Sequence, residues 1–212
     1  MNPTQFILVR HGETTWNRQG QIQGHLDSPL SSAGIAQAKA LAERLRMESF
    51  DVLISSDLGR AHNTTQYIAM RTGHAVSVDA RLRERHYGIF QGMTRSEAKS
   101  VYPDVYERYH AESVTYAIPG GESIEECFLR NLKCLQELAA RYPDKRIVVV
   151  THGGVLDGLY RHVMRLPHVG ARAFTIFNAS LNWFTCEDGE WLLDRWGDVA
   201  HLEGSNESLD DV

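Results

Sequence analysis

The sequence contains few cysteines: only Cys127, Cys134 and Cys186 occur among its 212 residues. Their odd number and the lack of a C-x-x-C spacing argue against a disulfide framework and against a zinc site. Cys127 and Cys134 are expected to share the buried face of one helix, where thiols behave as small apolar groups. This use of cysteine fits a reducing compartment, so we predict a cytoplasmic protein.

Long apolar runs and an excess of positive charge are also missing. No stretch approaches the ~20 apolar residues of a membrane span. The N-terminus lacks the basic region and the long apolar segment of a signal peptide. The net charge of −5 argues against sequence-independent binding of nucleic acid. We therefore expect neither nucleic acid nor membrane as a partner, and any anion site must be built locally by a few arginines.

Two short stretches share one design, an apolar run that leads into a histidine followed by a glycine. Residues 6–9 are followed by Arg10 and His11, and residues 147–150 are followed by Thr151 and His152. In an open parallel sheet, ligands bind outside the carboxyl ends of the strands. The two histidines can therefore meet in one pocket, to which Arg10 adds a fixed positive charge. Such a pocket suits a phosphoryl group above a histidine nucleophile.

Apolar strands alternate with helical patterns, which predicts a mostly parallel sheet with helices on both faces, a three-layer α/β/α domain. Strands are expected over residues 6–9, 52–54, 75–78, 147–150, 174–177, 183–185 and 191–193. Helices are expected after Ser31 or Ser32, between Asp57 as a cap and Gly73, and over about 95–111, 123–141 and 155–164. A hairpin signal at residues 187–189 predicts an antiparallel edge strand.

The whole chain, residues 1–212, is expected to form a single domain with a lid-like insertion at about 85–122. This stretch is rich in glycine, proline and tyrosine, and it lacks the alternation of strands and helices seen elsewhere. We expect it to cover one end of the sheet. Residues 203–212 are acidic and have no apolar periodicity, which indicates a loose tail.

His11 is the candidate nucleophile. A neutral imidazole nitrogen attacks phosphorus well, and histidine is an established covalent catalyst. The other ring nitrogen must be hydrogen-bonded so that the correct tautomer faces the substrate, and a backbone carbonyl in the Gly12 turn can serve. The alternative is a histidine that only satisfies its own hydrogen bonds at the end of a strand.

Three further side chains are candidates for the same site. Arg60 follows a strand and falls in the first turn of a helix. A cation is mildly disfavoured there unless it binds an anion, so Arg60 is a candidate anion ligand; the alternative is a solvated surface arginine. Glu84, in a covered pocket, can act as a general acid; the alternative is an exposed carboxylate paired with neighbouring arginines. His152, if protonated, would stabilise charge on the phosphoryl oxygens.

Six motifs occur together in an order that resembles the histidine phosphatase superfamily, in its phosphoglycerate mutase-like branch. The resemblance runs from residue 5 to about residue 202. It is carried by the segments FILVRHGETTWN at 6–17, QG at 23–24 with DSPL at 27–30, SSDLGRA at 55–61, LRE at 82–84, PGGES at 119–123 and THGG at 151–154.

The resemblance implies a phosphohistidine at His11 and a proton donor, later a base, at Glu84. It also implies that four side chains hold the phosphoryl oxygens: Arg10, Asn17, Arg60 and His152. The candidate substrate-binding set is completed by Gln23, Gly24, Tyr87, Arg95 and Gly153. The implied fold is that of the phosphoglycerate mutases, and the implied partner is a small phosphorylated metabolite. No metal and no organic cofactor are implied.

The insertion departs from that of the mutases, which is longer and carries an adjacent pair of arginines. Between residues 88 and 121 stand three cations, Arg95, Lys99 and Arg108, against four acids. Arg95 does match the position of a substrate-binding lysine of the mutases. Asn63 and Thr64 stand where the family more often has Gln-Thr.

These departures favour a phosphomonoester hydrolase, in which water attacks the phosphohistidine beneath a short, weakly charged lid. A phosphoglycerate mutase, dependent on bisphosphoglycerate, is the alternative. A non-catalytic module that binds phosphorylated ligands is disfavoured, because binding alone requires neither a nucleophile nor an acid. The organic part of the substrate and the oligomeric state stay open, with a homodimer among the options.

Overall fold

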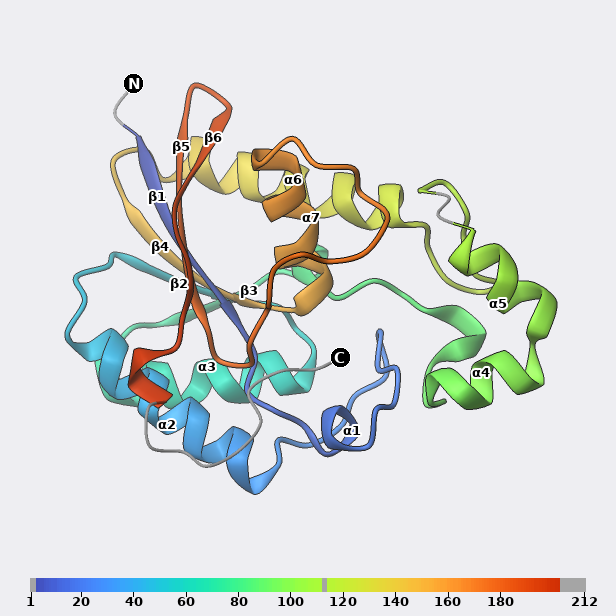
Figure 1. The fold of residues 1–212 in the computed structure, drawn as a ribbon. Helices are drawn as coiled ribbons and strands as arrows, with labels where there is room; N and C mark the ends of the chain where they lie inside the picture. Colours follow the sequence, from blue (N-terminus) through green and yellow to red (C-terminus); the bar gives the residue numbers. More distant parts are fainter. Residues whose placement is uncertain (1–2, 112–113, 203–212) are drawn as a thin grey trace.

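The computed structural model describes residues 3–111 and 114–202, and it is built on one sheet of six strands (Figure 1). The strand order is β3-β2-β4-β1-β5-β6. The strands are β1 (Thr4–Arg10), β2 (Val52–Ser55), β3 (Val76–Val78), β4 (Arg146–Thr151), β5 (Leu181–Glu187) and β6 (Glu190–Asp198). The first four pair in parallel, whereas β5 pairs antiparallel with β1, and β6 with β5. The predicted mixed sheet with an antiparallel edge strand is confirmed.

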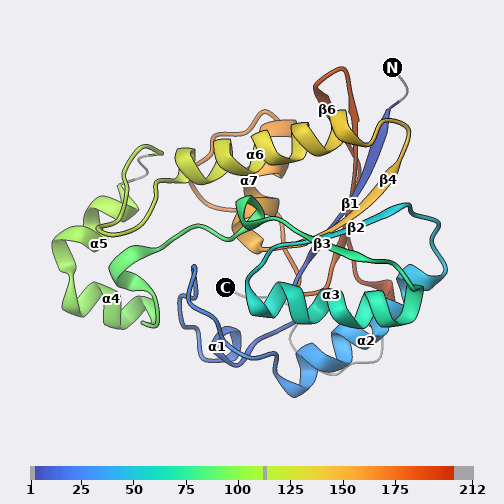
Figure 2. The same ribbon diagram turned by 180° about the vertical axis from the view of Figure 1, so that it is seen from behind.

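Helices cover both faces of this sheet, as Figures 1 and 2 show. One face carries α2 (Ser32–Arg46) and α3 (Gly59–Thr72), and the other carries α6 (Ile124–Arg141) and α7 (Gly153–Val163). Strand β1 supplies both cores, because alternate side chains point to opposite faces: Phe6 packs towards α6 and α7, and Ile7 towards α2 and α3. The expected three-layer α/β/α arrangement is confirmed. None of the helices in the described parts of the chain is both long and apolar enough to span a membrane.

Local sequence signals account for several of the helix ends. Ser31 caps α2 by accepting a hydrogen bond from the amide of Gly34, and Ser123 forms a capping box with Glu126 at the start of α6. Gly73 ends α3 in the left-handed conformation, at φ 76°. These three boundaries agree with the sequence analysis.

Other expectations about local structure were wrong. The expected helix over 95–111 is two helices, α4 (Arg95–Val101) and α5 (Pro103–His110), because Pro103 has no amide hydrogen to continue the first helix. Residues 174–177 form no strand; Phe174 instead stacks on Tyr160, with ring centroids 3.8 Å apart. The acidic stretch 203–212 lies outside the described residues.

One further expectation, about the start of α3, was also wrong. Leu58, and not Asp57, is the N-cap residue of α3, and its side chain makes no capping hydrogen bond. The carboxylate of Asp57 instead forms an ion pair with Arg83. Between β1 and α2 lies the one-turn helix α1 (Thr15–Arg18), which begins with a capping box between Thr14 and Asn17.

Helices α4 and α5 form a lobe beside the sheet, at the right of Figure 1. The lobe has a small core of its own, in which Phe90, Ala98 and Ile118 are buried among partly buried tyrosines. A β-bridge between Gln21 and Thr94 ties the start of α4 to the loop that follows α1.

The turn after β1 is pressed against the first turn of α2. A Cβ atom built on Gly34 would lie 1.9 Å from the carbonyl oxygen of Glu13, and one on Gly12 would lie 2.6 Å from the carbonyl oxygen of Gly34. Both neighbouring atoms are backbone, so neither side can move away freely. The glycines therefore permit the close approach that sets the position of the turn at residues 11–13.

We expect Gly34→Ala to lower the free energy of unfolding by about 1–3 kcal/mol, because the added methyl group forces backbone apart in a packed region. Urea unfolding measures this effect. Ser32→Ala, an exposed change in the same helical turn, is the control and should remain close to the wild type. Wild-type stability of Gly34→Ala would show that the turn and the helix separate without cost.

Candidate active site

The carboxyl ends of three parallel strands bring the predicted histidines together. His11 directly follows β1, and His152 follows β4 as the N-cap residue of α7. Their ring centroids are 5.2 Å apart. Ser56, which follows β2, reaches the same place and bonds to His152. The expected meeting of the two histidines at one end of the sheet is confirmed.

His11 is buried, and both of its ring nitrogens have a partner. Nδ1 lies 2.8 Å from the carbonyl oxygen of Gly12, and Nε2 lies 3.3 Å from Nε of Arg60. A guanidinium can only donate hydrogen bonds, so Nε2 accepts and the proton resides on Nδ1. Burial, followed by the charges of Arg60 and Arg10, holds the pKa of His11 well below its usual value. The ring is therefore neutral, with the Nε2 lone pair on the side of the arginines.

Arg60 is fully buried, with 1% of its surface exposed. Its guanidinium donates to the carbonyl oxygens of Gly24 (2.7 Å) and Leu26 (3.0 Å) and to the carboxylate of Asp27 (3.1 Å). Burial lowers the pKa of Arg60, and the carboxylates of Glu84 and Asp27 counteract this effect. The placement in the first turn of α3 agrees with the prediction, and the alternative of a solvated surface arginine is wrong.

Arg10 is also buried, and it donates to the carbonyl oxygen of Ile176 over 2.5 Å. Its guanidinium passes close to the first residue of α7, since a Cβ atom on Gly153 would lie 3.5 Å from Nε of Arg10. Arg10, Arg60 and the start of α7 thus surround the two histidines with positive charge and with a helix N-terminus. Anions are stabilised in such surroundings.

His152 is completely buried. Its Nε2 lies 2.8 Å from Oγ of Ser56, whereas Nδ1 has no hydrogen-bond partner among the described residues. Burial, with Arg60, His11 and Arg10 as further causes, holds the pKa of His152 well below its usual value. The free protein therefore has a neutral His152, and the protonated form considered from the sequence requires an anion in the site.

The carboxylate of Glu84 is held by two backbone amides. The N–H of Arg85 donates to Oε1 over 2.7 Å, and the N–H of Gly154 in α7 donates to Oε2 over 2.9 Å. A Cβ atom on Gly154 would lie 2.1 Å from Oε1, so only glycine permits this approach. Glu84 is half-buried and bonds to backbone groups, so the alternative of an exposed carboxylate paired with neighbouring arginines is wrong.

The other predicted residues lie around this cluster at different distances. Gly24 is bound to Arg60, and Gln23 beside it is buried. Tyr87 lies within electrostatic range of Glu84, and burial followed by Glu84 raises the pKa of its hydroxyl. Asn17 uses its side-chain oxygen to accept from the backbone N–H and the hydroxyl of Thr14.

Arg95 belongs to the lobe. It is exposed at the start of α4, within electrostatic range of His110 on α5. The bridge of Thr94 with Gln21 and the backbone hydrogen bonds of Ile22 with Gly92 and Met93 tie the start of α4 to the loop that continues to Gln23 and Gly24.

Sequence reasoning missed Ser56 as a partner of His152 and Asp27 as a partner of Arg60. Both stand within the quoted motifs, but neither received a role there. A hydroxyl directly after a buried strand is the signal that could have identified Ser56. Across the described residues, no group of three or more His, Cys, Asp or Glu side chains is placed to hold a metal ion.

Comparisons with known proteins identify related chains over almost the whole length. The model of the histidine phosphatase superfamily (branch 1) matches residues 6–199. Phosphoglycerate mutase-like protein 4 of Arabidopsis thaliana is 42% identical over 203 residues, which cover 94% of this chain and 87% of the relative. The metal-independent phosphoserine phosphatase of the same plant is 39% identical, with 94% and 83% covered.

Among solved structures, a mycobacterial glucosyl-3-phosphoglycerate phosphatase superposes with a TM-score of 0.79 at 33% identity. The match covers 92% of this chain and 99% of that one. This solved structure thus shares the arrangement of strands and helices described above.

The two neutral histidines make the free protein sensitive to acid. Unfolded histidine has a pKa of about 6.5, and folding lowers the pKa values of both His11 and His152. The unfolded chain therefore takes up these protons first as the pH falls. The contribution of these two histidines to the free energy of unfolding is fully present above about pH 6.5. Below this pH, the free energy of unfolding should fall by up to about 1.4 kcal/mol per pH unit for each histidine.

Urea unfolding of the free protein at about pH 7.5 and about pH 5.5 measures this loss. His152→Asn should show a shallower dependence on pH than the wild type, because one of the histidines with a lowered pKa is gone. His62→Asn, on α3, is the control and should keep the wild-type slope. Equal slopes for the wild type and His152→Asn would contradict the expectation.

Proposed function

Because this chain belongs to the histidine phosphatase superfamily, we propose that it hydrolyses small phosphomonoesters through a covalent phosphohistidine at His11. The protein is an enzyme of the histidine phosphatase type, with phosphatases among its relatives. The observation that supports the assignment of His11 is its neutral ring. Gly12 holds the proton on Nδ1, so the lone pair of Nε2 faces the buried arginines.

In the proposed first step, the phosphoryl group of the substrate lies among Arg10, Arg60, Asn17 and His152. Nε2 of His11 attacks phosphorus in line with the bond that breaks. The protonated Glu84 gives its proton to the leaving oxygen, so an alcohol departs rather than an alkoxide. Nε of Arg60, which donates to His11 in the free protein, then donates to an oxygen of the phosphoryl group.

In the proposed second step, water attacks the phosphohistidine. The Glu84 carboxylate takes the proton of this water, the bond between phosphorus and Nε2 breaks, and inorganic phosphate leaves. His11 returns to its neutral form, and Glu84 is protonated again for the next cycle. His152, neutral in the free protein, becomes a hydrogen-bond donor to the phosphoryl oxygens through Nδ1, because Ser56 occupies its Nε2.

The proposed substrates are small phosphorylated metabolites that carry a carboxylate. Two of the relatives are named for phosphoserine and for glucosyl-3-phosphoglycerate, and both of those compounds have a carboxylate near the phosphate. Gln23, Gly24, Tyr87, Arg95 and Gly153 are the proposed substrate-binding residues. We also propose that the insertion at about 85–122 acts as a lid of a single domain, and that the enzyme is cytoplasmic, as its three free, buried cysteines suggest.

The relative named phosphoglycerate mutase-like protein 4 keeps mutase activity as a second candidate. A mutase must hold a doubly phosphorylated intermediate while it reorients, which requires cations in the lid. Of the lid cations, Arg108 lies over the ring of Tyr116, at 4.5 Å, which favours the hydrolase. Assays of phosphate release and of phosphoglycerate isomerisation, with and without bisphosphoglycerate, separate the two activities.

We expect His11→Ala to abolish both turnover and covalent labelling while the fold survives, because truncation at a strand end leaves no large cavity. The measurement is phosphate release together with acid-labile labelling by a radioactive substrate. His62→Ala, on the nearby helix α3, is the control and should keep both signals. Full activity of His11→Ala would exclude the phosphohistidine.

We expect Glu84→Gln to slow phosphohistidine formation from alkyl phosphates by about 10²–10⁴-fold, the usual contribution of a general acid. Nitrophenyl phosphate should lose much less, because nitrophenolate leaves without a proton. Single-turnover formation of phosphohistidine with each substrate measures the difference. Glu125→Gln, exposed on α6, is the control. Equal losses for both substrates would show that Glu84 is not the acid.

A further inference from the structure

We propose that Arg130 of α6 is the positioning residue of Glu84, so that its loss impairs proton donation without weakening phosphate binding. This inference rests on the role of Glu84 in the proposed function. Sequence analysis assigned Arg130 no role, and its guanidinium touches neither His11 nor the arginines around it in any hydrogen bond of the described structure. Its partners are instead backbone carbonyl oxygens before and at Glu84 and the carboxylate of Glu122.

The guanidinium of Arg130 binds three carbonyl oxygens of the segment that carries Glu84. Nη1 donates to the carbonyl oxygens of Arg81 (2.6 Å) and Arg83 (3.1 Å), and Nη2 donates to that of Glu84 itself (3.3 Å). The planar guanidinium, with donors in fixed directions, suits such a set of acceptors in a way that a lysine ammonium does not. One side chain thus fixes the path of the backbone up to the residue that donates the proton.

The backbone after Glu84 is fixed by the carboxylate partner of Arg130. Nη2 and Nε of Arg130 donate to the two oxygens of Glu122, at 2.5 and 3.3 Å. Glu122 in turn accepts from the N–H of His86 (2.9 Å), and its own N–H donates to the carbonyl oxygen of His86 (2.9 Å). The pair of Arg130 and Glu122 therefore holds residues 81–86 on both sides of Glu84.

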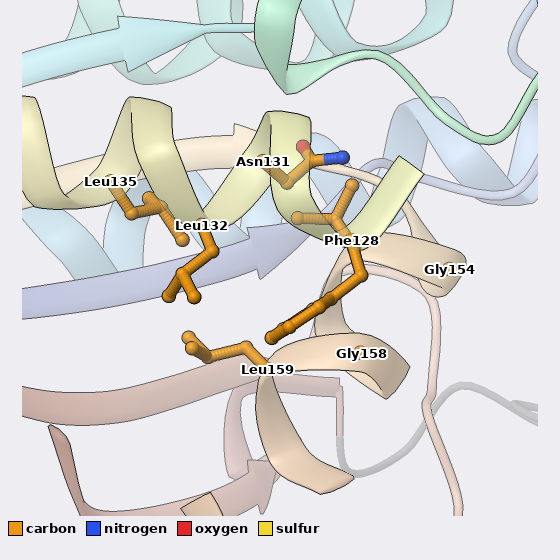
Figure 3. A pocket seen from close by; sticks show the side chains of 8 residues that line it. Phe128, Asn131, Leu132, Leu135, Gly154, Gly158 and Leu159 are labelled. Atoms are coloured by element: carbon orange, nitrogen blue, oxygen red, sulfur yellow. The ribbon is translucent and has the colours of Figure 1, made fainter. Parts of the chain in front are cut away.

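The helix that carries Arg130 is packed closely. Arg130 lies on α6, which packs against α7, the helix whose Gly154 N–H holds the carboxylate of Glu84. Figure 3 shows Phe128, Leu132 and Leu135 of α6 facing Gly158 and Leu159 of α7. The cavity left between the two helices is only about 10 Å³, which is about the size needed for one water molecule.

Glu84 is consequently fastened between the two helices. Its backbone is bound to α6 through Arg130, and its carboxylate is bound to α7 through the N–H of Gly154. Loss of the first attachment would remove the donor to the carbonyl oxygens of Arg81 and Arg83, and it would leave that of Glu84 with His25 alone. The carboxyl group could then move relative to the leaving oxygen. A misplacement of about 1 Å can cost about 10²-fold in rate.

The test compares single-turnover phosphohistidine formation in the wild type, Arg130→Ala, Glu84→Gln and the double variant. With an alkyl phosphate, Arg130→Ala should be slower by about 10²-fold, and with nitrophenyl phosphate by much less. The double variant should be hardly slower than Glu84→Gln alone, because Arg130 acts through Glu84. The affinity for inorganic phosphate should remain that of the wild type.

Two further variants complete the design. Arg141→Ala, exposed near the end of the same helix, should behave as the wild type with both substrates. Arg130→Lys keeps the charge but lacks the guanidinium geometry, so we expect an intermediate rate with alkyl phosphates. If Arg130→Ala does not fold, Arg130→Lys replaces it in the comparison, both alone and combined with Glu84→Gln.

Equal losses with the two substrates, or additive losses in the double variant, would overturn the positioning role and leave a purely structural one. These outcomes are distinct from a failure of the proposed function. If Glu84→Gln itself shows no dependence on the leaving group, the acid role of Glu84 fails, and the inference about Arg130 fails with it. If Glu84→Gln shows the dependence and Arg130→Ala does not, only the inference about Arg130 fails.

Discussion

The burial of a guanidinium beside a neutral imidazole is the interaction on which the rest of the site depends. Arg60 has 1% of its surface exposed, and its Nε faces Nε2 of His11. Removal of a cation from water is costly unless it is paired and hydrogen-bonded. The protein compensates Arg60 with the carbonyl oxygens of Gly24 and Leu26 and with Asp27. The loop at 24–27 is thereby held over the end of the sheet at which the two histidines meet.

The same burial determines the protonation state of the histidines. A positive neighbour and the loss of water both disfavour a second proton on His11 and on His152. The two rings stay neutral. The carbonyl oxygen of Gly12 sets the tautomer of His11, whereas Nε2 of His152 shares a hydrogen bond with the hydroxyl of Ser56. Under the proposed function, the buried guanidinium and the two neutral rings together receive the phosphoryl group of the substrate.

Local signals in the sequence predicted much of this arrangement. Apolar runs that end in His-Gly predicted the strand ends at His11 and His152, and capping residues such as Ser123 predicted helix starts. The errors arose where tertiary contacts override local preference. Asp57 is a good capping residue by type, yet it pairs with Arg83 across the fold. Residues 174–177 look like a strand, yet Phe174 packs against Tyr160 and Trp196.

The residues that sequence reasoning missed share one property. Ser56 and Arg130 act on groups that are distant in the chain: Ser56 on His152, and Arg130 on the backbone at residues 81–84. No spacing rule links such pairs, because their proximity depends on the order of the strands and on the packing of α6 against α7. By contrast, the Gly12 carbonyl is adjacent to His11, so its role could be predicted from the turn alone.

The two edges of the sheet differ from its centre, and this limits how copies of the molecule can associate. At one edge, β3 has only three residues. At the other, β6 carries charged side chains such as Asp194 and Arg195, and its pairing with β5 is interrupted by register shifts. Short, charged or irregular edges discourage a second sheet from pairing alongside. Continuation of the sheet into a neighbouring molecule is therefore disfavoured, and a homodimer would form through helix or loop surfaces.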